Sequence, residues 1–189
     1  RINLSAVSPP SVESLVSSAA AFNGLPPADF VEVYNSSAQR WDLSGWGLSD
    51  NINWPRKWTF PAGTSIGPGE YKVILLDKAA SPGSSGNLHA SFGLSRVGGE
   101  MMTLSDATGR VLDRMYLPAI PTDVSYGRTL GAGGFFYYDV PTPGRANGSG
   151  FTGYAEKPSF VTPGGLYKGV LTVAINVPEN TTVRYTTDG

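Results

Sequence analysis

The chain has 189 residues, a net charge of -1 and no cysteine. This composition excludes disulfide bonds, cysteine-ligated zinc and thiol catalysis, and the near-neutral charge argues against binding to nucleic acid. Only 15% of the residues are charged, while glycine and proline number 24 and 15. Short apolar runs cut by such turn residues favour an all-β sandwich or barrel, and no apolar run is long enough to predict a membrane span.

The predicted elements begin with a strand over residues 2–7, where apolar and polar side chains alternate. A short helix is expected over residues 11–21, because Pro9 and Pro10 are tolerated at a helix entry. Residues 30–34 alternate again, which predicts a half-buried strand. Val31 and Val33 would share one face of that strand, and Phe30, Glu32 and Tyr34 would share the other.

The segment around Trp46 is expected to turn tightly, because Gly45 and Gly47 flank a large ring. Trp46, Trp58 and Phe60 are predicted to enter the core. Residues 71–76 form a nearly continuous apolar run, which predicts a central strand covered on both faces. Residues 78–87 are small and polar and predict a surface loop.

A β-hairpin is predicted between residues 100–105 and 111–117. Asp106 begins the connecting turn and Gly109 ends it, as in a type I turn. Residues 135–139 predict a last aromatic strand. A glycine-rich linker follows at 148–157, and residues 158–189 predict a fragment of a second β-module, with strands at 159–162, 170–177 and 182–186.

Residues 29–147 resemble the bacterial branch of the lamin-tail domain family. The resemblance rests on these stretches: FVEVYN (30–35), DLSGWGLSD (42–50), WTFPAGTSIGPGEYKVI (58–74), LHASFGLS (88–95), GGEMMTLSDATGRVLDRM (98–115), DVSYGRT (123–129) and VPTPGRAN (140–147). It implies an immunoglobulin-like β-sandwich and a first domain at 1–147. A nuclear role, as in the animal relatives, is not expected, because no heptads and no basic run are present.

Residues 158–189 resemble the start of the Ig-like module at the C-terminus of chitobiases and β-hexosaminidases. The carrying stretches are PSFVTPGGLYKGVLTVAI (158–175) and TTVRYTTDG (181–189). Together the two resemblances imply an exported bacterial multidomain protein, outside the cell or at its surface. They imply an accessory role without catalysis, with other domains of the same polypeptide or surface proteins as partners.

Three motifs could carry chemistry, and each has a plainer explanation. Residues 63–67 match G-x-S-x-G, but no helix is expected after Ser65, as a nucleophile elbow requires. His89 is the only histidine, and no catalytic partner is placed by its spacing. Asp50, Asn51 and Asn53 offer oxygen ligands for calcium, although their spacing fails the EF-hand pattern. No catalytic residue, metal site or cofactor is therefore predicted.

The candidate ligand-binding residues are aromatic: Trp41, Trp54, Tyr137 and Tyr138. They are expected at turns or on the exposed side of a strand, where rings can stack on sugars or anchor a partner protein. Packing between the sheets, the rim and the linker is nevertheless the favoured explanation for them, and ligand binding is the alternative. The sequence therefore predicts a non-catalytic interaction module, with a carbohydrate-binding accessory domain as the alternative function.

Overall fold

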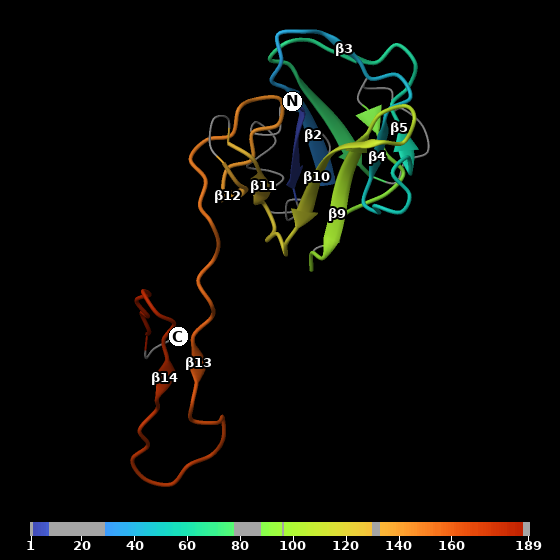
Figure 1. Cartoon of the computed structure of the whole chain (residues 1–189). Coiled ribbons are helices and arrows are strands. Elements are labelled where there is room, and N and C mark those ends of the chain that lie inside the picture. The colour runs from blue at the N-terminus through green and yellow to red at the C-terminus, as the bar shows by residue number, and fades with distance from the viewer. Residues whose placement is uncertain (1, 8–28, 78–87, 96, 130–132, 187–189) are drawn as a thin grey trace. The chain divides into compact units, whose positions relative to one another are not determined.

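The computed structural model describes residues 2–7, 29–77, 88–95, 97–129 and 133–186 (Figure 1). All regular structure in these ranges is β, and none of them forms a helix that could cross a membrane. The chain divides into two compact units, Arg1–Thr152 and Gly153–Gly189. The helix expected at 11–21 and the surface loop expected at 78–87 lie outside the described residues.

The larger sheet of the first unit has six strands in the order β12-β11-β1-β2-β7-β8. All neighbours are antiparallel except β7 and β8, which run parallel. The bounds of the strands are β1 Ile2–Val7, β2 Asp29–Asn35, β7 Tyr71–Leu76, β8 Leu88–His89, β11 Ser125–Gly127 and β12 Phe136–Tyr138.

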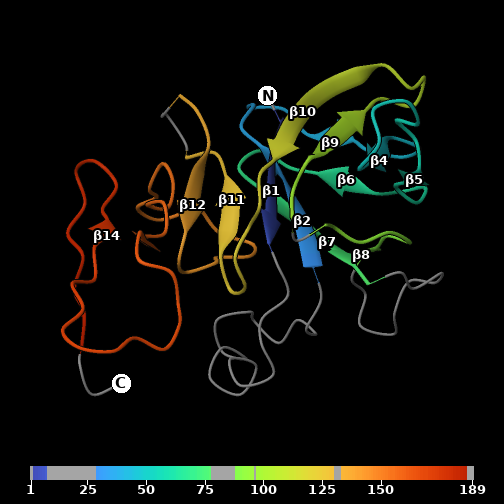
Figure 2. The same cartoon turned by 90° about the horizontal axis from the view of Figure 1, so that it is seen from below.

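The second sheet of this unit has four antiparallel strands in the order β10-β9-β4-β5, which Figure 2 shows from another side. Its strands are β4 Gly47–Ser49, β5 Trp58–Thr59, β9 Glu100–Ser105 and β10 Val111–Leu117. A further pair joins β3, Trp41–Asp42, to β6, Ser65–Ile66.

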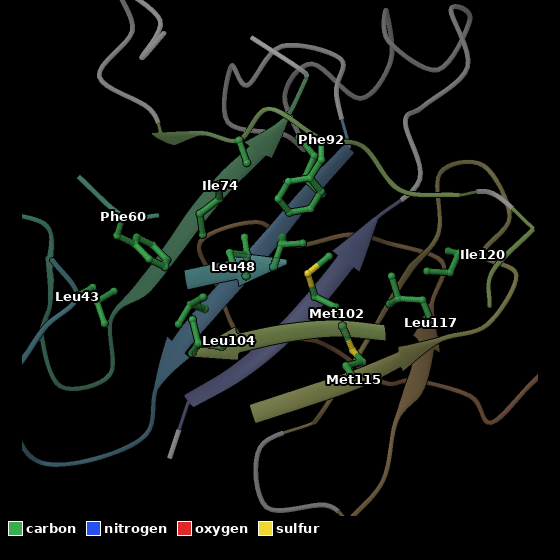
Figure 3. Close-up of a cluster of buried hydrophobic side chains, with 14 of the residues drawn as sticks. Leu43, Leu48, Phe60, Ile74, Phe92, Met102, Leu104, Met115, Leu117 and Ile120 are labelled. Carbon is green, nitrogen blue, oxygen red and sulfur yellow. The ribbon is translucent and has the colours of Figure 1, made fainter. Parts of the chain in front are cut away.

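One apolar core lies between the two sheets (Figure 3). Ile74 comes from the six-stranded sheet, and Leu48, Met102, Leu104 and Met115 come from the four-stranded sheet, all at 1% exposure or less. Alternation along each strand sends every second side chain into this space. The predicted all-β sandwich is confirmed. Phe60 is buried as predicted, whereas Trp46 and Trp58 are partly buried and pack against the core.

Strand β2 departs from the prediction of a half-buried strand. Val31 and Val33 do face the core, but Phe30 and Glu32 on the opposite face are buried as well, at 2% and 4% exposure. Strand β2 lies inside the six-stranded sheet, and the segment around Gly144 packs over Glu32. The alternation along β2 predicted correctly which residues share a face. It could not predict that a distant segment covers the second face.

The predicted β-hairpin is confirmed. β9 and β10 pair in register from Leu117–Glu100 to Val111–Ser105, with a bulge between Val111 and Asp113. The Gly109 amide donates to the Asp106 carbonyl at 3.0 Å, and Gly109 has a φ of 91°. That left-handed conformation suits glycine, so the turn ends at the residue that the sequence indicated.

The second unit contains one antiparallel pair, β13 Ser159–Phe160 and β14 Ile175–Asn176. Both strands are shorter than the predicted runs at 159–162 and 170–177. The strand predicted at 182–186 is wrong, because these residues pair with no neighbouring strand. The predicted boundaries at 147 and 157 remain predictions.

Candidate interaction site

A largely exposed segment with its own hydrogen bonds is Asp50–Lys57, here called the tryptophan loop, which connects β4 to β5. Two successive turns build it. The Trp54 amide donates to the Asn51 carbonyl at 3.0 Å, and the Lys57 amide donates to the Trp54 carbonyl at 3.1 Å. Pro55 stands second in the later turn, the position that favours proline. The loop therefore has a defined backbone.

The polar side chains of the tryptophan loop hold the loop itself. The Asn51 side-chain oxygen accepts the Asn53 amide at 2.9 Å, and Lys57 Nζ bonds both oxygens of Asp50 at 2.7 and 2.8 Å. These are the groups considered above as calcium ligands. No cluster of three or more acidic or histidine residues that could hold a metal occurs in the described ranges. The Asn51 side chain closes a turn on the Asn53 amide, and the Asp50 carboxylate pairs with Lys57, so both have partners within the loop.

The tryptophan loop is fastened to the outer face of the four-stranded sheet. Ser105 Oγ of β9 donates to the Pro55 carbonyl at 2.9 Å. A Cβ on Gly47 of β4 would lie 2.4 Å from that same oxygen, so only glycine leaves room for the loop. Leu48 and Leu104 point into the core at 0% exposure, and their neighbours Gly47 and Ser105 point outward beneath the loop.

The tryptophan loop presents two apolar side chains to solvent. Trp54 is 58% exposed and Ile52 is 44% exposed. Trp41, on β3, is 40% exposed, and its Nε1 donates to Ser37 Oγ at 2.9 Å. Its ring lies 6.2 Å from the ring of Trp46. Two of the four predicted ligand-binding residues, Trp41 and Trp54, are therefore on the surface.

Tyr137 and Tyr138 are not exposed, and the prediction that they are is wrong. Tyr137 is 9% exposed and exchanges two backbone hydrogen bonds with Phe151, at 2.8 and 3.0 Å. Their rings stack at 5.8 Å, and burial raises the pKa of the Tyr137 phenol. Tyr138 is 2% exposed, and its hydroxyl bonds Thr129 Oγ1 at 2.7 Å. The chain beyond β12 folds back as a cover that strand periodicity did not reveal.

Strand β10 adds an exposed row that the sequence analysis did not single out. Leu112 and Tyr116 are 40% and 57% exposed, and Arg114 between them is exposed too. Met115 and Leu117 alternate with this row and are buried. The alternation of residues 114–117 was a signal for this row, because Met115 and Leu117 are apolar while Arg114 and Tyr116 carry polar groups.

Two residues considered for catalysis in the sequence are His89 and Ser65. His89 Nδ1 lies 2.6 Å from Asp77 Oδ2, a pair that spacing alone did not indicate. The Nε2 of His89 is buried and bonds no group in the part of the chain that the structure describes, so no described hydroxyl is hydrogen-bonded to it. Ser65 lies in β6 and accepts a bond from Arg40 at 3.0 Å. A strand rather than a helix follows the Gly63–Gly67 turn region, which does not make a nucleophile elbow.

One buried carboxyl group lies on the other sheet. Glu32 Oε2 accepts the Gly144 amide at 2.5 Å, and the desolvation of this side chain raises its pKa to about 7. The Gly144 hydrogen bond opposes that shift in part. Beside it, the rings of Tyr34 and Tyr71 stack at 4.4 Å. The arrangement ties the segment after β12 to the sheet.

Two packed sheets around one core, with a braced exposed loop on the outer face, define a β-sandwich domain with a candidate binding surface. The family model of the lamin tail domain matches residues 5–118, and the chain belongs to that family. The predicted immunoglobulin-like fold is therefore confirmed, and this family is a non-catalytic kind of domain.

The family match begins before residue 29 and ends before residue 147, the two bounds of the predicted range. The comparison with curated proteins found no match. No comparison gave evidence for the chitobiase-type module at 158–189, which remains a prediction.

Proposed function

We propose that the chain is a non-catalytic interaction module of an exported bacterial multidomain protein. In this role it spaces or docks a neighbouring domain, or mediates adhesion, outside the cell or at its surface. The observation that carries the proposal is the tryptophan loop, which holds Trp54 at 58% exposure on a loop bonded to the sheet through Ser105.

The backbone of the tryptophan loop is ordered before a partner binds, which lowers the cost of binding. A binding surface loses less free energy to ordering when its side chains already stand on a fixed backbone. The tryptophan loop has two backbone turns, the Asp50–Lys57 ion pair and the seat on Gly47. Exposed tryptophan is also among the residues that most often dominate the binding energy of an interface. A fixed Trp54 thus suits recognition and needs no catalytic group.

We extend this proposal to the second unit, which we assign to a chitobiase-type Ig-like module. The support is the sequence resemblance at 158–175 and 181–189, together with the antiparallel pair β13–β14. Two modules in sequence suit a polypeptide built from several domains.

Carbohydrate binding is the second candidate function. It is favoured by the exposure of Trp54 and Trp41, because a flat indole face can stack on a sugar ring. Because Tyr137 and Tyr138 are buried, these two tryptophans are the remaining candidates for contact with a sugar. In this form the module would hold a catalytic region close to a polysaccharide.

The test is co-sedimentation of the chain with insoluble cell-envelope fractions from Gram-positive and Gram-negative bacteria. The chain is expected to sediment with an envelope, Trp54→Ala is expected to stay in solution, and Val97→Ala is expected to sediment. Val97 is a suitable control because it is 84% exposed and lies outside the tryptophan loop. Protease treatment of the envelope removes binding if the partner is a protein and leaves it if the partner is a glycan.

Two results would overturn the proposal. Equal sedimentation of Trp54→Ala and the unaltered chain would show that the tryptophan loop is not the docking surface. Turnover of an envelope component, abolished by His89→Ala, would show that the module is catalytic.

A further inference from the structure

The outer face of the four-stranded sheet joins the tryptophan loop to the exposed row of β10. In the β9–β10 register Arg114 lies opposite Thr103, and in the β4–β9 register Thr103 lies opposite Ser49. Ser49 directly precedes the tryptophan loop. Neighbouring strands are about 5 Å apart, so Arg114 stands roughly 10 Å from β4, across one strand. The tryptophan loop and the exposed row of β10 thus lie on the same face of the four-stranded sheet, on either side of the buried Thr103 and Ser49.

Two arginines on this surface lack a carboxylate partner in the part of the chain that the structure describes. These are Arg56 in the tryptophan loop and Arg114 on β10, both exposed. Their neighbours are paired: Lys57 with Asp50, Arg110 with Asp106 and Arg128 with Asp113. A chain with a net charge of -1 thus carries unneutralised positive charge beside its most exposed tryptophan.

The Arg56 side chain lies close to three glycines. A Cβ on Gly47 would meet its Cγ at 2.7 Å, and a Cβ on Gly109 would meet its Cδ at 3.8 Å. The guanidinium lies 4.0 Å from the Cβ position of Gly45. The Arg56 side chain therefore passes close to the backbone of these three glycines, where a larger residue at position 47 would displace it.

We propose that this surface binds an acidic polysaccharide, with uronic acid carboxylates on Arg56 and Arg114 and a sugar ring on Trp54. The proposal rests on the interaction role of the tryptophan loop and specifies its ligand. A planar guanidinium binds a carboxylate through two parallel hydrogen bonds, and an indole offers a flat apolar face between charged units. Two unpaired arginines are few for a nucleic-acid-binding surface, which neutralises many phosphates.

The test is isothermal titration of the whole chain with three polymers: polygalacturonate, its fully methyl-esterified form and poly-glutamate. We expect polygalacturonate to bind at least tenfold more tightly than either of the others at 50 mM NaCl. The advantage should shrink at 300 mM NaCl, because salt screens exposed charges. Arg56→Gln and Arg114→Gln should each lower the affinity for polygalacturonate about three- to tenfold without changing that for the ester.

Arg40→Gln is the matched control, because Arg40 is an exposed arginine that bonds Ser65 of β6, away from this surface. It should bind polygalacturonate as the unaltered chain does. Trp54→Ala should lose affinity for the acid and the ester alike.

The named outcomes separate this inference from the proposed function. Equal binding of the acid and the ester, lost in Trp54→Ala, would overturn the role of the arginines and leave the tryptophan loop as the docking surface. Equal binding of poly-glutamate would overturn the choice of a sugar polymer. If polygalacturonate does not bind, the inference is overturned entirely. The docking role of the tryptophan loop would then still be tested by envelope sedimentation. Binding that persists in Trp54→Ala and both arginine variants would place the ligand elsewhere.

Discussion

The two units of the chain are both β, yet they differ in whether their apolar side chains are buried. In the first unit Ile74 and Leu75 of β7 are fully buried. In the second unit no residue that the structure describes is buried, and Leu166 and Val170 are fully exposed. The apolar run at 170–177 is as hydrophobic as β7. What differs is the number of strands around each run.

Strand β7 lies between β2 and β8, and the four-stranded sheet covers it, whereas β14 pairs only with β13 among the residues that the structure describes. A two-stranded hairpin is at best marginally stable in water, because it has no second layer on which to bury a face. The comparison teaches that an apolar run predicts a strand, while its burial depends on partners that the run itself does not encode. Three predictions can break or sharpen this contrast.

The largest effect is expected from one leucine exchanged in each unit. Leu104 is 0% exposed in the core, so Leu104→Ala should cost about 2–5 kcal/mol of unfolding free energy through lost burial and the cavity left behind. Leu166 is fully exposed, so Leu166→Ala should change stability by less than about 0.5 kcal/mol. Urea unfolding followed by far-UV circular dichroism and by tryptophan fluorescence measures both.

All four tryptophans lie in the first unit, so fluorescence reports on that unit and circular dichroism reports on both. A cost above about 1 kcal/mol for Leu166→Ala, seen by circular dichroism alone, would mean that the second unit buries this side chain in solution. The contrast between the units would then fail.

Local sequence pattern was enough for the features made by neighbouring residues. The hairpin of β9 and β10 was predictable because Asp106 and Gly109 define its turn within four residues. The burial of Tyr137 and Glu32 was not, because Phe151 and Gly144 come from other parts of the chain. The tryptophan loop shows both cases. Its own turns follow from Asn51 and Pro55, but its seat depends on Ser105, fifty residues away.

The carboxyl of Glu32 is buried, whereas Glu156 and Glu179 of the second unit are exposed. The pKa of Glu32 in the folded chain is about 7, above the ordinary value of 4.5. The raised pKa means that its contribution to stability is fully present below pH 4.5 and is lost as the pH rises through 7. The shift corresponds to about 3 kcal/mol, reached near pH 9.

Glu32→Gln keeps an oxygen for the Gly144 amide and removes the ionisation. The variant should therefore be more stable than the unaltered chain at pH 9, by up to about 3 kcal/mol, and similar to it at pH 4.5. Urea unfolding across this pH range measures the difference. Glu179→Gln, at an exposed carboxylate of the second unit, is the control and should follow the unaltered profile. Parallel profiles for Glu32→Gln and the unaltered chain would show that Glu32 is not desolvated.

The smallest effect is expected at the seat of the tryptophan loop. A Cβ on Gly47 would lie 2.4 Å from the Pro55 carbonyl and 2.5 Å from Ser105 Oγ, so Gly47→Ala must push the loop off the sheet. We expect a loss of about 1–3 kcal/mol and a greater quenching of tryptophan fluorescence by acrylamide. Gly148→Ala is the matched control, because nothing lies within 4 Å of its Cβ position. If Gly47→Ala keeps the unaltered stability and quenching, the loop is not fastened to the sheet. The tryptophan loop would then be unsupported by packing, as the side chains of the second unit are, and the proposal of a fixed binding surface would be wrong.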